Sequence, residues 1–204
     1  MEQKYKIAEI FESIQGEGGW QGKWCLFVRF AGCNLHCAFC DTNHKVRMEI
    51  QETVLVESLR GLHPKYIVLT GGEPMLQITP SLVRKLRRLP SYPDIAIETN
   101  GTIWNEALYY VDYIAVSPKA DGVLATEIKY NKVDELRLVC TADGLVTPKV
   151  TDFFRNIQQV TISPVFDKDG KINKTALNRA LLLVEKHPDV MRLSVQLHKL
   201  IGVQ

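Results

Sequence analysis

Short β-rich runs alternate with amphipathic stretches along the chain, and this alternation constrains the fold more than any other feature. Several of these runs are almost continuously apolar, as in parallel strands that helices cover on both faces. The expected strands are Lys6–Ile10, Cys25–Phe30, Tyr66–Thr70, Ile95–Glu98, Tyr113–Val116, Glu135–Val139, Gln159–Ile162 and Arg192–Gln196. We therefore predict an α/β fold built from repeated βα units.

Helical periodicity lies between the expected strands. Leu55, Ser58, Leu59 and Leu62 share one face of a helix by their spacing of three and four residues. A second helix carries its apolar residues over 82–89 and begins at Thr79, followed by Pro80, which are favoured at the cap and the first turn. A third covers 177–184 and stops before Pro188, and Trp104–Tyr110 is a short fourth.

Length limits how far the βα repeat can go. The chain has 204 residues, fewer than the roughly 250 of a full eightfold barrel. We therefore predict an incomplete (β/α) barrel of one domain, residues 1–204.

The charge and the hydropathy of the chain exclude several classes of partner. The net charge is +2, without the large excess of basic residues that is typical of a nucleic-acid-binding protein. No apolar run approaches the ~18 residues of a membrane span, and Met1–Glu9 has no apolar signal core, so we expect a cytoplasmic protein without membrane or nucleic-acid partners.

Polar and glycine-rich segments follow the expected strands. In a βα barrel the carboxyl ends of the strands meet on one face, so such segments can line a single pocket. They are Ala31–Thr42, Thr70–Pro74, Glu98–Gly101, Ser117–Lys119, Ser163–Pro164 and Gln196–Lys199.

Three of the five cysteines lie within eight residues: Cys33, Cys37 and Cys40. Three thiolates can bind three irons of a [4Fe–4S] cluster and leave the fourth iron open, whereas electron-transfer clusters take four cysteines. The alternative is a zinc site completed by His36 or His44. Tandem glycines at 71 and 72 favour the cluster, because a backbone without Cβ lets a bound ligand come close.

The cysteine motif and the later Gly71-Gly72-Glu73-Pro74 together resemble the radical S-adenosylmethionine (SAM) enzymes, and Phe39 before the last cysteine fits the same pattern. Within that superfamily the chain is similar to the 7-carboxy-7-deazaguanine synthases from about Lys6 to its end. The similar segments are Phe11–Gly18, Arg29–Leu35, Cys40–Thr42, Glu98–Gly101, Ser117–Lys119 and Gln196–Lys199.

The resemblance implies an activity. It implies a carbon–nitrogen lyase that converts 6-carboxy-5,6,7,8-tetrahydropterin to 7-carboxy-7-deazaguanine with loss of ammonia, in the biosynthesis of 7-deazapurines, the precursors of queuosine. The implied cofactors are a [4Fe–4S] cluster, SAM, which is cleaved to a 5′-deoxyadenosyl radical and regenerated, and Mg²⁺. An electron donor of flavodoxin or ferredoxin type and a homodimer are implied as well.

The resemblance also implies roles for individual residues. Cys33, Cys37 and Cys40 would hold the cluster, and Thr42 would bind magnesium. The implied SAM-binding residues are Phe39, Cys40, Asp41, Gly72, Glu73, Glu98, Asn100, Ser117, Pro118, Lys119, Ser163, Pro164, Val165 and Phe166. The implied pterin-binding residues are Ile14, Gln15, Gly16, Glu17, Arg29, Thr70, His198 and Gln204.

Some residues have other interpretations. Arg29 suits a substrate carboxylate, because a guanidinium matches it with two hydrogen bonds, but it can also pair with an acidic side chain of the barrel. Glu73 can cap a helix, and His198 near the end of a strand can be structural. Ser163–Phe166 stands where the family often has Gln-Pro-Met, and Gln204 ends a chain that often ends in Pro or Ala. The competing functions are another small radical SAM enzyme, such as an activase, and a zinc-stabilised binding module.

Overall fold

The computed structural model describes residues 2–119, 133–146 and 157–203, which form two compact units. Unit 1 contains the residues up to Ser13, Trp24–Thr99 and Ile103–Ile114. Unit 2 contains Ile14–Lys23, Asn100–Thr102 and the described residues from Ala115 onward. Each unit contains its own parallel strands and helices.

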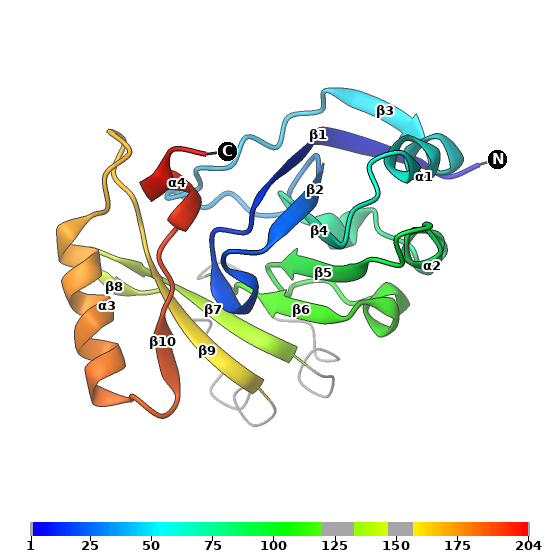
Figure 1. Cartoon of the computed structure of the whole chain (residues 1–204). Coiled ribbons are helices and arrows are strands. Elements are labelled where there is room, and N and C mark those ends of the chain that lie inside the picture. Colours follow the sequence, from blue (N-terminus) through cyan, green and yellow to red (C-terminus); the bar gives the residue numbers. More distant parts are fainter. Residues whose placement is uncertain (1, 120–132, 147–156, 204) are drawn as a thin grey trace. The chain divides into compact units, whose positions relative to one another are not determined.

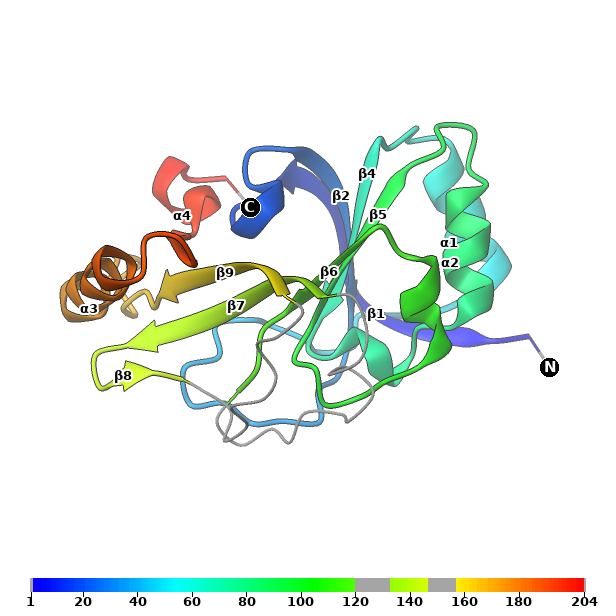
Figure 2. The same cartoon turned by 90° about the horizontal axis from the view of Figure 1, so that it is seen from below.

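Unit 1 is built on a mainly parallel sheet. Its strands are β1 (Lys4–Ile14), β2 (Trp24–Phe30), β3 (Met48–Gln51), β4 (Tyr66–Gly71) and β5 (Asp94–Thr99), in the order β5-β4-β2-β1-β3. Strands β2, β4 and β5 are parallel, and β3 pairs with β1 in the antiparallel direction (Figure 1). Helices α1 (Glu52–Arg60) and α2 (Pro80–Arg87) lie together on one side of these strands (Figure 2). Unit 1 also contains two 3-10 helices, η2 (Pro74–Leu76) before α2 and η3 (Glu106–Tyr110) after β5.

The helices of unit 1 follow the apolar spacing of the sequence. The hydroxyl of Thr79 accepts a hydrogen bond from the Leu82 amide at 3.2 Å, which confirms the predicted cap of α2. Helix α1 ends at Arg60, so Leu62 lies beyond it and is 45% exposed. The prediction that Leu62 belongs to the buried helical face is therefore wrong.

A buried carboxylate connects the two helices of unit 1 to the first strand. Glu52 at the start of α1 accepts hydrogen bonds from Tyr5 at 2.7 Å and Ser81 at 2.6 Å, and Lys85 lies 2.6 Å away. Burial alone would raise the pKa of Glu52, but the hydrogen bonds from Lys85, Ser81 and Tyr5 lower it below its ordinary 4.5. Burial, and then the bond to Glu52, raise the pKa of the Tyr5 hydroxyl. The negative charge of Glu52 therefore stabilises the packing of unit 1.

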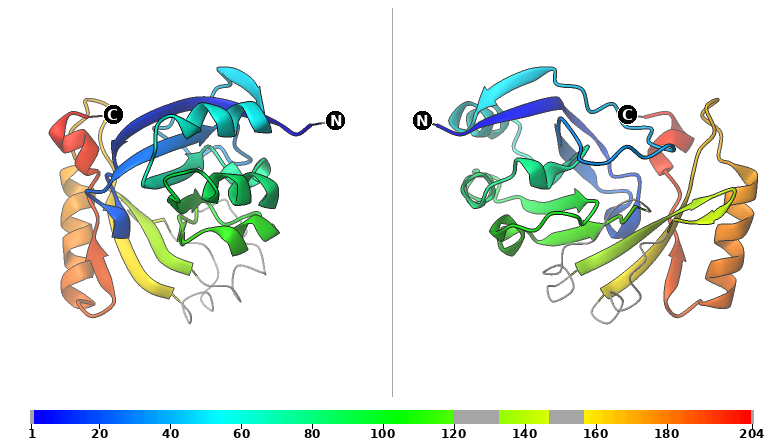
Figure 3. Two further views of the ribbon diagram at one scale, coloured as in Figure 1. Left: turned by 45° about the vertical axis from the view of Figure 1, so that its right-hand side comes forward. Right: turned by 180° about the vertical axis from the view of Figure 1, so that it is seen from behind.

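Unit 2 contains a second set of parallel strands. They are β7 (Val133–Thr141), β9 (Ile157–Pro164) and β10 (Met191–Leu193), in the order β10-β9-β7, with the short β8 (Gly144–Leu145) folded back on β7. The last two residues of β6 (Tyr113–Val116) pair with β7. Helix α3 (Lys174–Lys186) contacts β7, β9 and β10 and buries Ala176 and Ala180 (Figure 3). A 3-10 turn η1 (Gly18–Trp20) and helix α4 (Leu197–Ile201) complete the unit.

The predicted strands are present with boundaries shifted by a few residues, but the last one is much shorter. Strand β10 ends at Leu193, not Gln196, and the chain then turns into α4, which ends at Gly202 in a left-handed conformation. His198 therefore lies in a short helix rather than at a strand end, because the Leu197 amide bonds to carbonyl oxygens of Gly16 and Val195 instead of to a neighbouring strand. No described helix is long and apolar enough to cross a membrane.

Candidate active site

The Gly71–Glu73 turn of unit 1 packs directly on the loop that carries the cysteines. Strands β2 and β4 pair so that Phe30 lies opposite Gly71, and the two following loops therefore start side by side. The Glu73 amide donates a hydrogen bond to the Gly32 carbonyl oxygen at 2.9 Å. A Cβ at Gly72 would overlap that carbonyl oxygen and lie 2.8 Å from Cβ of Cys33. The tandem glycines thus let the turn touch the first residue of the cysteine motif.

The cysteine loop itself fits a cluster. None of the three cysteines forms a disulfide, and Cys33 and Cys37 are partly exposed and Cys40 is exposed. The Cys40 amide donates to the Cys37 carbonyl oxygen at 3.1 Å, and the Gly32 amide donates to the His44 carbonyl oxygen at 2.9 Å, which closes the loop. Within the described residues no group of three or more His, Cys, Asp or Glu side chains is placed to hold one metal ion. Three accessible thiols on one loop suit a cluster, which binds each thiolate at a separate iron.

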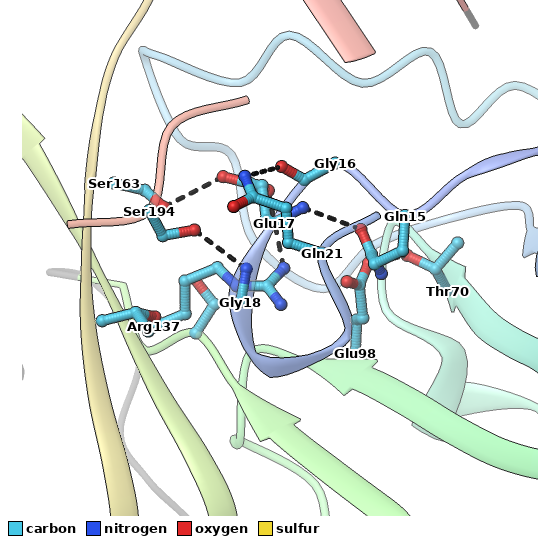
Figure 4. Close-up of polar contacts among 12 residues, drawn as sticks. Gln15, Gly16, Glu17, Gly18, Gln21, Thr70, Glu98, Arg137, Ser163 and Ser194 are labelled. Carbon is cyan, nitrogen blue, oxygen red and sulfur yellow. Dashed lines mark hydrogen bonds and ion pairs between the residues drawn. The ribbon is translucent and has the colours of Figure 1, made fainter. Parts of the chain in front are cut away.

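Three predicted ligand-binding residues form a row across neighbouring strands of unit 1. Arg29 of β2 pairs in register with Thr70 of β4, so both side chains point to the same face. The Thr70 hydroxyl donates a hydrogen bond to Glu98 of β5 at 2.9 Å (Figure 4). The structure therefore brings together two predicted pterin-binding residues and one predicted SAM-binding residue at the carboxyl ends of three strands.

Arg29 has an acidic neighbour as well. Its Nε lies 3.6 Å from a carboxylate oxygen of Glu9, and its guanidinium lies 5.6 Å from the ring centre of Phe11. Arg47 approaches the other oxygen of Glu9 at 3.9 Å. Pairing of Arg29 within the protein, the alternative drawn from the sequence, is thus confirmed, and binding of a substrate carboxylate stays a prediction.

Glu73 is fully buried and caps the 3-10 helix η2. Its Oε1 accepts hydrogen bonds from the Met75 amide at 3.0 Å and from the Thr99 hydroxyl at 2.7 Å. The capping role is therefore confirmed, and contact with SAM stays a prediction. On the cysteine loop, Phe39 and Thr42 are partly exposed and Asp41 is exposed, and their contacts with SAM and magnesium also stay predictions.

In unit 2 the predicted pterin-binding segment Ile14–Glu17 lies against His198, which is far from it in the sequence. The Gly16 carbonyl oxygen accepts hydrogen bonds from the Leu197 amide at 3.0 Å and from Gln21 at 2.8 Å (Figure 4). A Cβ at Gly16 would overlap the ring of His198, so only glycine permits this approach. The side chain of Gln15 accepts a hydrogen bond from the Glu17 amide at 3.1 Å, and Ile14 is half-buried.

Glu17 contacts a residue that was predicted to bind SAM. The Ser163 hydroxyl donates a hydrogen bond to Glu17 Oε1 at 3.0 Å, at the end of β9 (Figure 4). After Ser163 and the buried Pro164, the backbone of Val165 is engaged within the protein, because its amide donates to Cys140 at 2.9 Å and its carbonyl oxygen accepts from Asn173 at 3.0 Å. Contact of these residues with SAM stays a prediction.

The other predicted residues of unit 2 also have contacts within the unit. Asn100 Oδ1 accepts hydrogen bonds from the amide of Thr102 at 2.9 Å and from its hydroxyl at 2.7 Å. Lys119 donates to the Ser117 hydroxyl at 2.6 Å, and Pro118 between them is buried. Lys199 lies 4.9 Å from the ring centre of Phe166. Gln204 falls outside the described residues.

Comparison with known proteins gives the family. The radical SAM superfamily matches residues 27–121. A 7-carboxy-7-deazaguanine synthase from Bacteroides thetaiotaomicron is 33% identical over 199 residues, which are 98% of each chain. One from Neisseria meningitidis is 34% identical over 98% of this chain and 95% of its own. The chain belongs to the 7-carboxy-7-deazaguanine synthases, a family of radical SAM enzymes.

Membership confirms the expectation of a radical SAM enzyme, with the SAM and [4Fe–4S] cluster that the family implies. The zinc-stabilised binding module and the activase are thereby set aside. The crystal structure of QueE from Escherichia coli superimposes with a TM-score of 0.73 at 21% identity, covering 96% of this chain and 95% of that one. That likeness shows the fold and confirms the incomplete (β/α) barrel.

Two charged residues on β7, Glu135 and Arg137, are not predicted from the sequence. Both are buried, and Arg137 lies 3.5 Å from the carboxylate of Glu17. A sequence feature that could have identified them is the presence of Asp134, Glu135 and Arg137 in the otherwise apolar stretch 133–140. Charged side chains inside a buried strand require partners.

Proposed function

We propose that this enzyme converts 6-carboxy-5,6,7,8-tetrahydropterin to 7-carboxy-7-deazaguanine with release of ammonia. The observation that carries the proposal is the contact between the Gly71–Glu73 turn and the Cys33 loop in unit 1. It joins the two motifs that a radical SAM reaction needs, a cluster-binding loop and a glycine turn open to a close ligand. The names of the relatives, which match over almost the whole chain, supply the product.

The cofactor-binding residues follow from these motifs. Cys33, Cys37 and Cys40 would hold the [4Fe–4S] cluster. Bound cluster and SAM would supply the radical that removes hydrogen from C6 of the pterin. The residues of the chain would position the substrate next to the radical and shield the reaction from water. We propose that SAM is surrounded by Phe39, Cys40, Asp41, Gly72, Glu73, Glu98, Asn100, Ser117, Pro118, Lys119, Ser163, Pro164, Val165 and Phe166.

The pterin would be bound by the polar row on β2 and β4 together with the Ile14–Glu17 segment, His198 and Gln204. The guanidinium of Arg29 would take the substrate carboxylate, with two hydrogen bonds in one plane. The substrate would then compete with Glu9, whose oxygen lies 3.6 Å from the Arg29 Nε. Thr70, in register with Arg29, would contribute its hydroxyl.

We further propose a magnesium ion bound by Thr42 and by oxygens of the substrate and water. Hard cations take oxygen ligands, and Thr42 follows the last cysteine by two residues. Magnesium would then raise turnover by holding the substrate beside the cluster.

Residues 1–204 would act as one radical SAM domain in a homodimer. A molar mass of two chains by light scattering would support the dimer, and the mass of one chain at micromolar concentration would contradict it. We place the enzyme in the cytoplasm, where a reducing environment would keep Cys33, Cys37 and Cys40 available as thiolates for the cluster. A flavodoxin or ferredoxin would supply the electron.

The decisive experiment is anaerobic turnover of the carboxytetrahydropterin with SAM and a chemical reductant, with the product identified by mass. We expect 7-carboxy-7-deazaguanine from wild type, and no product and no cleaved SAM from Cys37→Ala. Protein that carries iron and cleaves SAM but leaves the pterin unchanged would refute the substrate. Colourless protein that contains zinc, without the ~400 nm band of an iron–sulfur cluster, would refute the radical chemistry.

A further inference from the structure

A buried ion pair on β7 lies directly beneath the Glu17–Gly19 segment of unit 2. Arg137 bonds Glu135 through two nitrogens, Nε to Oε1 at 3.0 Å and Nη2 to Oε2 at 3.1 Å. The side chain of Glu135 is fully buried, and that of Arg137 is 8% exposed. Thr161 of β9 donates a further hydrogen bond to Glu135 Oε1 at 2.5 Å. This geometry fixes the plane of the guanidinium, because two parallel bonds leave it little freedom to rotate.

The pair also holds the segment above it at two residues, Glu17 and Gly19. Arg137 Nη1 lies 3.5 Å from Glu17 Oε2, and the Gly19 amide donates to Glu135 Oε2 at 3.3 Å. The Gly18 amide between them donates to the Ser194 hydroxyl at 2.9 Å (Figure 4). Gly18 has a φ of +69°, and a Cβ there would overlap the Glu135 carboxylate. The backbone therefore rests on the ion pair at a distance that only glycine permits.

Glu17 is the member of this group that reaches solvent. Its side chain is 17% exposed, compared with 8% for Arg137 and 0% for Glu135. Oxygen Oε1 accepts from Ser163 and Oε2 faces Arg137, so both oxygens have a fixed direction. A carboxylate held in this way can offer its remaining lone pairs to N–H donors of a ligand without first losing side-chain freedom.

We propose that Arg137 is a positioning residue that orients the Glu17 carboxylate for the substrate, and that Glu135 and Thr161 fix Arg137 for this purpose. The inference rests on the proposed function, because Glu17 is there a pterin-binding residue. A pair with only a structural role would need no contact with the segment above it, whereas this pair bonds Glu17 by its side chain and Gly19 by its amide.

The test uses Arg137→Met in the full chain with its cluster. We expect the KM for the pterin to rise about 10- to 100-fold, the effect of losing one charge-assisted hydrogen bond. Iron content and uncoupled SAM cleavage should stay at the wild-type level. The control is Arg87→Met, which removes the Arg87–Asp112 pair of 2.6 Å in unit 1 and should leave the KM unchanged.

A double-mutant cycle separates positioning from general stability. If Arg137 acts through Glu17, the two substitutions affect the same contact. The double variant Glu17→Gln/Arg137→Met should then have a KM no higher than that of the single variant with the higher KM. If the KM effects are additive, or if iron content falls in parallel, the positioning role is refuted. Since Arg137→Met leaves a buried carboxylate without its partner, Glu135→Gln/Arg137→Met serves as a second variant in which both charges are removed. It should fold and show the same rise in KM, and a wild-type KM in this variant would overturn the inference.

Hydrogen exchange of the substrate-free protein gives a readout that does not depend on the reaction. The amide of Gly19 should exchange at least about tenfold faster in both Arg137 variants than in wild type and Arg87→Met, because Arg137 no longer holds Glu17 or orients the residue-135 side chain to which this amide donates. Unchanged exchange would refute the inference even if the enzyme acts on the pterin. Absence of pterin turnover by wild type would instead refute the proposed function, and exchange would still decide whether the pair holds the segment.

Discussion

Gly72→Ala tests whether the contact between the glycine turn and the cysteine loop supports the cluster. The new Cβ would overlap the Gly32 carbonyl oxygen and come within 2.7 Å of the Gly32 carbonyl carbon and 2.8 Å of Cβ of Cys33. These neighbours are backbone or the first side-chain carbon, so they cannot move away by a change of rotamer. Overpacking of this kind costs about 1–3 kcal/mol, and the simplest relief is a shift of the loop that carries Cys33.

A shift of that size changes the cluster site measurably. A penalty of about 1–3 kcal/mol lowers the population of the correct loop conformation about 5- to 150-fold relative to the shifted one. We therefore expect less iron per chain and a weaker ~400 nm band after anaerobic reconstitution, with a corresponding loss of SAM cleavage. The band and a colorimetric iron assay measure this effect directly.

Gly61→Ala is the matched control. A Cβ at Gly61, just after α1, meets nothing within 4 Å, and its φ of −73° suits any residue. This variant should bind iron and cleave SAM as wild type does. If Gly72→Ala also retains full iron content and full SAM cleavage, the contact with Cys33 has no role in cluster binding.

Four other variants separate the parts of unit 1. Cys37→Ala should abolish both the ~400 nm band and SAM cleavage, whereas Arg29→Ala should retain both and weaken pterin binding about 10- to 100-fold; a bleached cluster in Arg29→Ala would make that residue structural. Thr42→Val keeps the shape and removes the oxygen, so turnover should lose its response to magnesium while SAM cleavage persists; an unchanged magnesium response would exclude Thr42 as a ligand. Glu52→Gln should lower the free energy of unfolding by about 2–4 kcal/mol at neutral pH. Because the pKa of Glu52 is lowered in the folded state, its stabilisation is complete above the ordinary value of 4.5 and is lost as pH falls further; urea unfolding should therefore show the two proteins converging in acid, and a constant difference would refute the role of the charge.

The sequence predicts those parts of the fold that depend on local patterns. Strand β6 has the predicted bounds and β4 differs by one residue, because continuous apolar runs are typical of strands covered on both faces. The edge strands β3 and β8 were not predicted, since they are short and lack such a run. Helix α4 was also missed, because its start depends on a hydrogen bond from Leu197 to the distant Gly16.

Site residues, too, can be predicted where they belong to a local pattern and not where they depend on distant contacts. The cysteine motif and the Gly71–Glu73 turn are local patterns, and the structure places them in contact. Arg137 has no such pattern, since its partner Glu17 lies 120 residues earlier in the chain. Buried charges inside a strand indicate that partners exist, but only the folded structure identifies them.

The register of three strands explains why unit 1 can present Arg29, Thr70 and Glu98 independently of the cysteine loop. Arg29 pairs with Thr70, and Thr70 bonds Glu98, so the row is fixed by the sheet itself. The preceding residues on each strand, Val28, Leu69 and Ile97, are buried on the opposite face. A slip of one residue would move Val28, Leu69 and Ile97 to the face that carries the polar row, so the burial of these apolar side chains holds the row in register. The polar row should thus persist in Cys37→Ala, which changes only the loop beyond β2, so loss of the cluster should leave the proposed pterin-binding face folded.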